Sequence, residues 1–142
     1  MRAVVAVDHS GSTIGGKTQA RLLNTASSTI DRLESQGYDV AAIGYSDSVD
    51  VVQDFGRVNK QAFLKEVCNA EAAATGDTGA LRLAEAMIGD EPGIVAFVTD
   101  GIGETDFAAA VRQAEGRNHH VVGYMVGSSN ETEAFTESYI IR

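Results

Sequence analysis

The sequence predicts an α/β fold, in which helices cover both faces of a mostly parallel sheet to give three layers. Short apolar runs alternate along the chain with segments that have helical periodicity. Two of these runs, residues 4–7 and 94–98, are continuously apolar, as expected of strands buried on both faces. The chain has 142 residues and is 44% hydrophobic, which suits one core. We therefore expect a single domain over residues 1–142.

The first half of the chain predicts two helices and three strands. Residues 4–7 form the first strand, and a helix over residues 18–36 follows, ended by Gly37. Its apolar stripe consists of Leu22, Ala26, Ile30 and Leu33. Residues 38–46 and 49–55 read as two strands joined by a short turn, which makes them an antiparallel hairpin. Asn59 is placed to cap a helix that runs to residue 70.

The second half continues the alternation of helix and strand. A helix over residues 80–88 ends before Pro92 and Gly93, and the strand over residues 94–98 follows. The next helix ends near residue 117 and has Thr105 or Asp106 as its cap. Two more strands, residues 121–126 and 139–141, complete the chain. The sum is a three-layer, Rossmann-like sandwich with one antiparallel strand at a sheet edge.

Composition and charge limit the class of partner. The formal net charge is −9 and the isoelectric point is about 4.6, which argues against nucleic acid and anionic membranes as generic partners. No apolar run is long enough to cross a bilayer. Cys68 is the single cysteine, so an internal disulfide is excluded. Because the first strand starts almost at Met1, we expect no signal peptide and a cytoplasmic location.

Polar side chains alternate directly after the first strand. In an extended segment, the side chains of Asp8, Ser10 and Ser12 would point to the same side. They follow the carboxyl end of a strand, where open α/β sheets bind ligands. A carboxylate and two hydroxyls form an oxygen-only site, which favours Mg²⁺, Ca²⁺ or Mn²⁺ over zinc. A second acid, Asp100, follows the strand over residues 94–98 in the run Thr99-Asp100-Gly101.

These motifs resemble those of the von Willebrand factor A (VWA) family. The family pattern has Asp-x-Ser-x-Ser after the first strand, a threonine before a later helix and Thr-Asp-Gly after the next strand. Here the first and last motifs are Asp8/Ser10/Ser12 and Thr99-Asp100-Gly101, and residues 44–49 resemble the family's hairpin. The resemblance covers nearly the whole chain and implies a metal-ion-dependent adhesion site (MIDAS).

The middle threonine of the pattern has two candidates. Residues 80–84 resemble the family's helix, and counting without gaps from them places the metal threonine at Thr75. Thr78 is the alternative, which requires a deletion. The loop departs from the family pattern, because Ala73 and Ala74 replace the usual glycines and Asp77 replaces a usual apolar residue.

The resemblance also implies how the site works. Ser10 and Ser12 would bind the metal directly, Asp8 and Asp100 directly or through water, and Thr75 according to ligand state. The open coordination position would take an Asp or Glu carboxylate from a protein partner, so the domain is expected to be non-enzymatic. Intracellular members scaffold complexes that include ring-forming AAA+ ATPases, and we expect that kind of partner here.

Three further acids should surround the predicted site. Asp77, Glu104 and Asp106 lie in the predicted loops near its rim. Such carboxylates should strengthen cation capture and repel an acidic partner until the metal is bound. We therefore expect partner binding to depend on the metal.

Two other functional classes compete with this interpretation. Gly11–Thr18 matches the phosphate-binding loop pattern G-x-x-x-x-G-K-[ST] between a strand and a helix, and predicts a nucleotide-binding protein. That alternative leaves Asp8, Ser10 and the loop with Thr75 unexplained. A hydrolase with Asp8 as nucleophile would need a nearby base, and His9 is the only local candidate.

Overall fold

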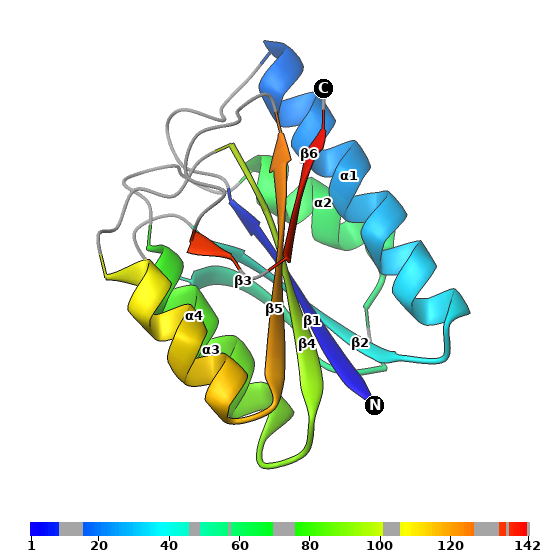
Figure 1. Ribbon diagram of the computed structural model, residues 1–142. Helices are drawn as coiled ribbons and strands as arrows, with labels where there is room; N and C mark the ends of the chain where they lie inside the picture. The colour runs from blue at the N-terminus through cyan, green and yellow to red at the C-terminus, as the bar shows by residue number, and fades with distance from the viewer. Residues whose placement is uncertain are drawn as a thin grey trace.

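The predicted α/β class is confirmed by the computed structural model, which describes residues 1–8, 16–45, 49–56, 58–69, 76–100, 106–126, 134–135 and 137–141. The described strands form one six-stranded sheet in the order β3-β2-β1-β4-β5-β6 (Figure 1). The strands are β1 (Arg2–Asp8), β2 (Asp39–Tyr45), β3 (Val49–Gln53), β4 (Gly93–Thr99), β5 (His119–Val126) and β6 (Glu137–Ile141). Five strands run parallel, and only β3 is antiparallel, at the edge beside β2, as the hairpin predicts.

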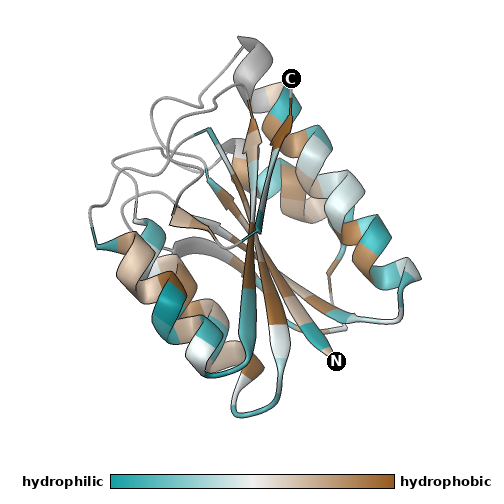
Figure 2. Ribbon diagram, viewed as in Figure 1, coloured by the Kyte–Doolittle hydropathy of each residue, from teal (hydrophilic) through white to brown (hydrophobic). Residues whose placement is uncertain are grey.

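Helices cover both faces of the sheet (Figure 1). On one face lie α1 (Gly16–Ser35) and α2 (Lys60–Asn69), and on the other lie α3 (Asp77–Ile88) and α4 (Phe107–Gly116). Strand β1 is buried on both sides because its successive side chains point to opposite faces. Val5 packs in the core with Leu22 of α1, whereas Val4 packs in the core with Leu81 of α3. Figure 2 shows the resulting hydrophobic colouring of the central strands.

Local signals fix two of the helix ends where the sequence predicts them. The side-chain oxygen of Asn59 accepts a hydrogen bond from the Ala62 N–H at 3.1 Å, which caps α2. Gly37 follows α1 with a φ of 89°, a left-handed conformation that glycine adopts without strain. These caps separate the helices from the strands that follow.

The start of α3 differs from the prediction, whereas α4 follows Asp106 as predicted. Helix α3 begins at Asp77, three residues before the predicted start. The polar run Asp77-Thr78-Gly79 resembles a loop, yet an acid in the first turn is stabilised by the positive end of the helix dipole. Asp106 does precede α4, but its carboxylate caps no described N–H of that helix. It accepts a hydrogen bond from Thr78 instead.

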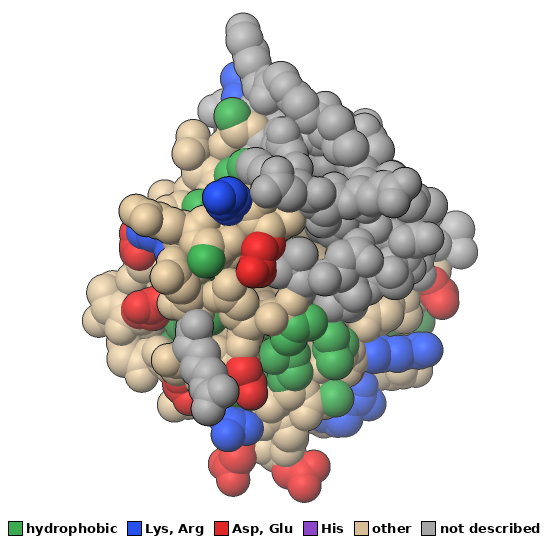
Figure 3. Space-filling view, turned by 180° about the vertical axis from the view of Figure 1, so that it is seen from behind, with side chains coloured by type: hydrophobic (Ala, Val, Ile, Leu, Met, Phe, Trp, Pro, Cys, Tyr) green, Lys and Arg blue, Asp and Glu red, His purple; other side chains and the backbone are tan. Residues whose placement is uncertain are grey.

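The described surface mixes charges of both signs. Figure 3 shows acidic and basic side chains interspersed around a small hydrophobic area on the rear face. The negative net charge is therefore not gathered into one acidic patch on the described part of that face. Among the helices of the described residues, none has both the length and the apolar character needed to cross a bilayer.

Candidate metal centre

Three polar side chains occupy the last positions of three adjacent parallel strands. Asp8 ends β1, Tyr45 ends β2 and Thr99 ends β4. Asp8 and Tyr45 are register partners, and Val7 pairs with Val98 one step earlier. With the two-residue period of a strand, all three side chains point to the face covered by α3. The sheet thus brings them to one point above its carboxyl edge.

The carboxylate of Asp8 is buried and held by a neighbouring hydroxyl. Asp8 is 2% exposed and Thr99 is fully buried. Thr99 Oγ1 donates a hydrogen bond to Asp8 Oδ2 over 2.8 Å. A hydrogen bond to a charged acceptor is stronger than a neutral one, so it fixes the orientation of this carboxylate. The predicted first and last motifs are therefore in direct contact.

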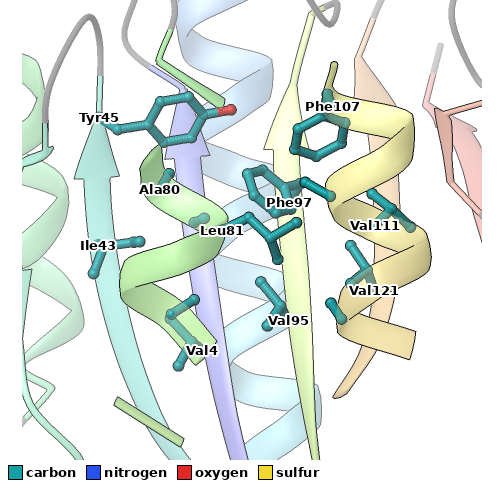
Figure 4. Close-up of a cluster of buried hydrophobic side chains, with 14 of the residues drawn as sticks. Val4, Ile43, Tyr45, Ala80, Leu81, Val95, Phe97, Phe107, Val111 and Val121 are labelled. Carbon is teal, nitrogen blue, oxygen red and sulfur yellow. The ribbon is translucent and has the colours of Figure 1, made fainter. Parts of the chain in front are cut away.

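A second buried carboxylate lies at the start of α3. Asp77 is fully buried, and the hydroxyl of Tyr45 donates to its Oδ1 over 2.7 Å. Figure 4 shows Tyr45 at the end of its strand, with Ala80 and Leu81 of α3 beside it. Burial raises the pKa of the Tyr45 phenol well above its ordinary value, and the charges of Asp8 and Asp77 raise it further. Asp77 is thus a buried helix residue rather than the loop residue that the sequence predicts.

The remaining described candidates lie around this centre. Thr78 is nearly buried, and its hydroxyl donates to Oδ1 of Asp106 over a long 3.4 Å. Asp106 is exposed, whereas Asp100 directly follows β4 and is half-buried. The pair formed by Thr78 and Asp106 connects the starts of α3 and α4. Thr78 is therefore part of a helix at the site and not of a preceding loop.

Several predicted residues lie outside the described part of the chain. They are His9, Ser10, Ser12, Thr75 and Glu104, together with residues 11–15 of the phosphate-loop pattern. The role of each stays a prediction. Within the described residues, no group of three or more His, Cys, Asp or Glu side chains is arranged to hold a metal.

The chemistry of the described donors fits a hard cation. The groups at this edge are carboxylates (Asp8, Asp100) and hydroxyls (Thr78, Thr99), and all of them are oxygen donors. Oxygen sets of this kind suit Mg²⁺, Ca²⁺ or Mn²⁺.

Sequence reasoning missed Tyr45 as a residue of the site. The available signal was the strand period, because Tyr45 continues the face of Ala41 and Ile43 to the end of β2. Its contact with Asp77 joins residues 32 positions apart and has no local sequence signature.

Another polar cluster lies at the opposite end of α3. Glu85 is 8% exposed and receives two hydrogen bonds from Arg117, from Nε at 2.9 Å and from Nη2 at 2.7 Å. His119, which is 3% exposed, places Nδ1 2.9 Å from Glu85 and Nε2 2.9 Å from the Gly89 carbonyl. Burial alone would raise the pKa of Glu85, but the bonds from Arg117 and His119 outweigh it and lower that pKa.

Comparison with solved structures supports the fold. The vWF domain of the type V pili tip protein Mfa5 from Porphyromonas gingivalis superposes with a TM-score of 0.68 at 11% identity, over 98% of this chain and 89% of that one. An aerotolerance-related membrane protein from Bacteroides fragilis gives 0.70 at 15% identity, over 87% and 66%. Proximal thread matrix protein 1 from the mussel byssus, with a zinc-occupied MIDAS motif, gives 0.67 at 16% identity. That match covers 99% of this chain but only 41% of the mussel protein, so the chain spans less than half of its length.

Comparison at the sequence level identifies the family. No curated protein matches this sequence significantly. The family model described as von Willebrand factor type A domain matches residues 4–137. That match covers nearly every element of the sheet, from β1 to the start of β6. The chain therefore belongs to the von Willebrand factor type A domain family.

Proposed function

We propose that this VWA domain binds a protein partner through a divalent cation held at the carboxyl ends of β1 and β4. The proposed ligands are Asp8, Ser10, Ser12, Thr75 and Asp100, with Thr78 as the alternative to Thr75. The observation that carries the proposal is the buried carboxylate of Asp8, which Thr99 orients while Asp100 follows on the adjacent strand. The proposed role is non-enzymatic, and domains of this family are typically protein-interaction modules.

The residues of the chain would orient and partly neutralise the cation. Two carboxylates offset most of the charge of a divalent ion, while hydroxyl ligands leave it able to attract a further anion. When bound, the cation would supply an open coordination position to an Asp or Glu of the partner. We propose Mg²⁺ first, with Ca²⁺ and Mn²⁺ as substitutes. The zinc-occupied MIDAS of the mussel protein adds Zn²⁺ to the ions worth testing.

The partner is proposed to be a protein that presents an acidic side chain, such as a subunit of an AAA+ ATPase complex. The net charge of −9 disfavours nucleic acid and anionic membranes as alternatives. A cytoplasmic location stays a prediction, and the solved structures of similar fold include a pilus tip protein and a membrane protein. The nucleotide-binding alternative is not favoured, because Gly11–Thr18 lies inside the stretch that the VWA family model matches.

Thermal unfolding in chelator and in each metal tests the proposal. A ligand that binds only the folded state stabilises it by about 2.7 kcal/mol at a hundredfold excess over its dissociation constant. We expect Mg²⁺ or Mn²⁺ to raise the melting temperature of the native chain and not that of Asp8→Ala. Asp100→Ala is a second variant that removes a half-buried acid, in case Asp8→Ala does not fold. Glu34→Ala, at an exposed position of α1, is the control and should keep the full shift. A native chain that melts at the same temperature in chelator and in every metal would rule out the metal site.

A further inference from the structure

We propose that the ring of His120 is a pH-sensitive link, which in its doubly protonated form ties the edge strand β6 to helix α4. This inference goes beyond the proposed function and needs no metal. His120 is the second residue of β5, Glu115 lies in the last turn of α4, and Glu137 is the first residue of β6. The link therefore joins three separate elements of the fold.

The first step concerns the two nitrogens of the His120 ring. Nδ1 lies 3.0 Å from Oε1 of Glu115, and Nε2 lies 3.0 Å from Oε1 of Glu137. An ionised carboxylate only accepts hydrogen bonds, and a neutral imidazole has a single N–H. A neutral ring can therefore donate to one of these two carboxylates, whereas a protonated ring donates to both. The two acceptors on opposite sides of the ring thus favour its charged form.

The second step concerns how the two carboxylates are held. Oε1 of Glu115 also accepts a hydrogen bond from the backbone N–H of Val121 at 3.0 Å, which keeps it beside β5. Oε2 of Glu137 accepts a hydrogen bond from the hydroxyl of Tyr139 at 2.6 Å. Because an acid in the last turn of a helix faces the negative end of the helix dipole, Glu115 gains from a cation beside it. Both carboxylates are thus oriented by groups other than His120.

The third step concerns the other charges around the ring. The described ionisable side chains near His120 are Glu115 of α4, Tyr124 of β5, Glu137 and Tyr139 of β6, and Arg32 of α1. Its register partner on β4 is the apolar Ile94. Arg32 carries an opposing positive charge, but its guanidinium lies over the ring of Tyr124, 5.2 Å from the ring centroid. The acids are therefore the charged groups in direct contact with His120.

The fourth step gives the direction of the pH dependence. Partial burial alone would lower the pKa of His120, but the hydrogen bonds to Glu137 and Glu115 and the charges of these acids outweigh it and raise that pKa. A group whose pKa is raised by folding stabilises the folded form fully below its unfolded value, which is about 6.5 for histidine. That stabilisation is lost as the pH rises through the folded value. The link should therefore weaken as the pH rises above neutrality.

Strand β6 depends on such a link because it lies at the edge of the sheet (Figure 1). Among the described strands it pairs with β5 alone. Its side chains are half-buried or exposed, with Tyr139 48% and Ile140 42% exposed. Segments with few buried side chains open locally at a lower free energy than the core does. Loss of the link should thus increase local opening of β6 and leave the rest of the sheet closed.

The test compares the native chain with His120→Gln, Glu137→Gln and Glu66→Gln, all in chelator. Ring nitrogen NMR shifts give the pKa of His120, and amide hydrogen exchange gives the protection factors of β6 and β1. We expect His120 to titrate above its ordinary value of about 6.5 in the native chain, and closer to that value in Glu137→Gln.

The protection of β6 relative to β1 should fall about threefold between about pH 6 and about pH 8 in the native chain. The change is small because the side chain of His120 is 39% exposed, so solvent screens both pairs. In His120→Gln the protection of β6 should not depend on pH. Glu66→Gln is the matched control and should behave as the native chain, because Glu66 is an exposed acid on α2, which packs against β3 at the opposite sheet edge.

Three results would overturn the inference. The first is a native His120 that titrates at or below about 6.5. The second is an unchanged pKa of His120 in Glu137→Gln, because the ring would then not bridge the two acids. The third is a protection of β6 that is constant with pH in the native chain, or that falls equally in His120→Gln. Since every measurement is made in chelator, none of these results depends on the proposed metal site.

Discussion

Helix α3 carries a buried carboxylate near each end, and the two carboxylates have different hydrogen-bond partners. Asp77 in the first turn is fully buried, and Glu85 in the last turn is 8% exposed. One donor to Asp77 is the neutral hydroxyl of Tyr45. The donors to Glu85 are the guanidinium of Arg117 and the ring of His119. The two acids of α3 thus differ in their hydrogen-bond partners: a phenol hydroxyl contacts Asp77, whereas a guanidinium and an imidazole ring contact Glu85.

The helix dipole explains part of this difference. An acid in the first turn faces the positive end of the dipole, whereas an acid in the last turn faces the negative end. Glu85 is therefore stabilised by a cationic partner within the protein, the guanidinium of Arg117, and by a hydrogen-bond contact with the ring of His119. The two ring nitrogens of His119 contact Glu85 and the Gly89 carbonyl, which fixes the ring between α3 and the residue that follows it. The acid near the C-terminal end of α3 is thus paired within the protein, and the N-terminal end of α3 lies beside the proposed metal site.

Removing Glu85, in the last turn of α3, should have the largest effect on stability. Glu85→Ala leaves Arg117 and His119 without their shared carboxylate. The buried ring of His119 loses its acceptor, whereas the pair with Arg117, whose side chain is 54% exposed, adds little, so we expect the free energy of unfolding to fall by about 1–3 kcal/mol. Urea denaturation measures this change. The exposed Glu34→Ala should stay within about 0.5 kcal/mol of the native chain, and an equal loss in both variants would contradict the pairing of Glu85 within the protein.

Removing the hydroxyl of Thr99 at the end of β4 should have a smaller effect on stability. Thr99→Val keeps the shape of the side chain but removes the donor to Asp8. We expect a loss of about 1–2 kcal/mol in urea denaturation in chelator, because a buried carboxylate oxygen loses a partner. Thr29→Val is the matched control, since Thr29 is equally buried and its hydroxyl donates only to the Thr25 carbonyl of its own helix. If both variants lose the same stability, Asp8 does not depend on Thr99.

The smallest expected effect is the pH dependence of the stability that Glu85 contributes. The pKa of Glu85 is lowered in the folded protein, so its contribution to stability is complete above the ordinary glutamate pKa of about 4.3. The contribution is lost as the pH falls through the folded value. Urea denaturation between about pH 6 and pH 3 should therefore show a shallower loss of stability for Glu85→Gln than for the native chain. Parallel curves for the two proteins would show that Glu85 does not contribute to acid unfolding.

The fold was predictable because its signals are local. Continuous apolar runs marked the strands, and the period of Leu22, Ala26 and Ile30 marked the buried stripe of α1. Asn59 and Gly37 marked helix ends through chemistry that acts over a few residues. The start of α3 was missed because Asp77-Thr78-Gly79 has a composition typical of loops, whereas burial and the helix dipole make its acid part of the helix.

The site was predictable only where it follows strand ends. Asp8 and Asp100 were predicted as ligands because parallel strands bring their carboxyl ends to one edge, and their role stays a prediction. The contact of Tyr45 with Asp77 spans 32 residues, and that of His119 with Glu85 spans 34. His119 lies at the start of β5, and its side chain is buried. The roles of Ser10, Ser12 and Thr75 stay predictions.

The central position of β1 has a consequence for how the chain folds. Its two neighbours, β2 and β4, lie about 40 and 90 residues away along the chain. The first of these pairings can form early in synthesis, but the second must wait until residue 99 has left the ribosome. Contacts between such distant segments carry a large loop-closure entropy and slow the folding step. The strand made first is thus among the last to be enclosed, and its apolar sides stay exposed to aggregation until β4 arrives.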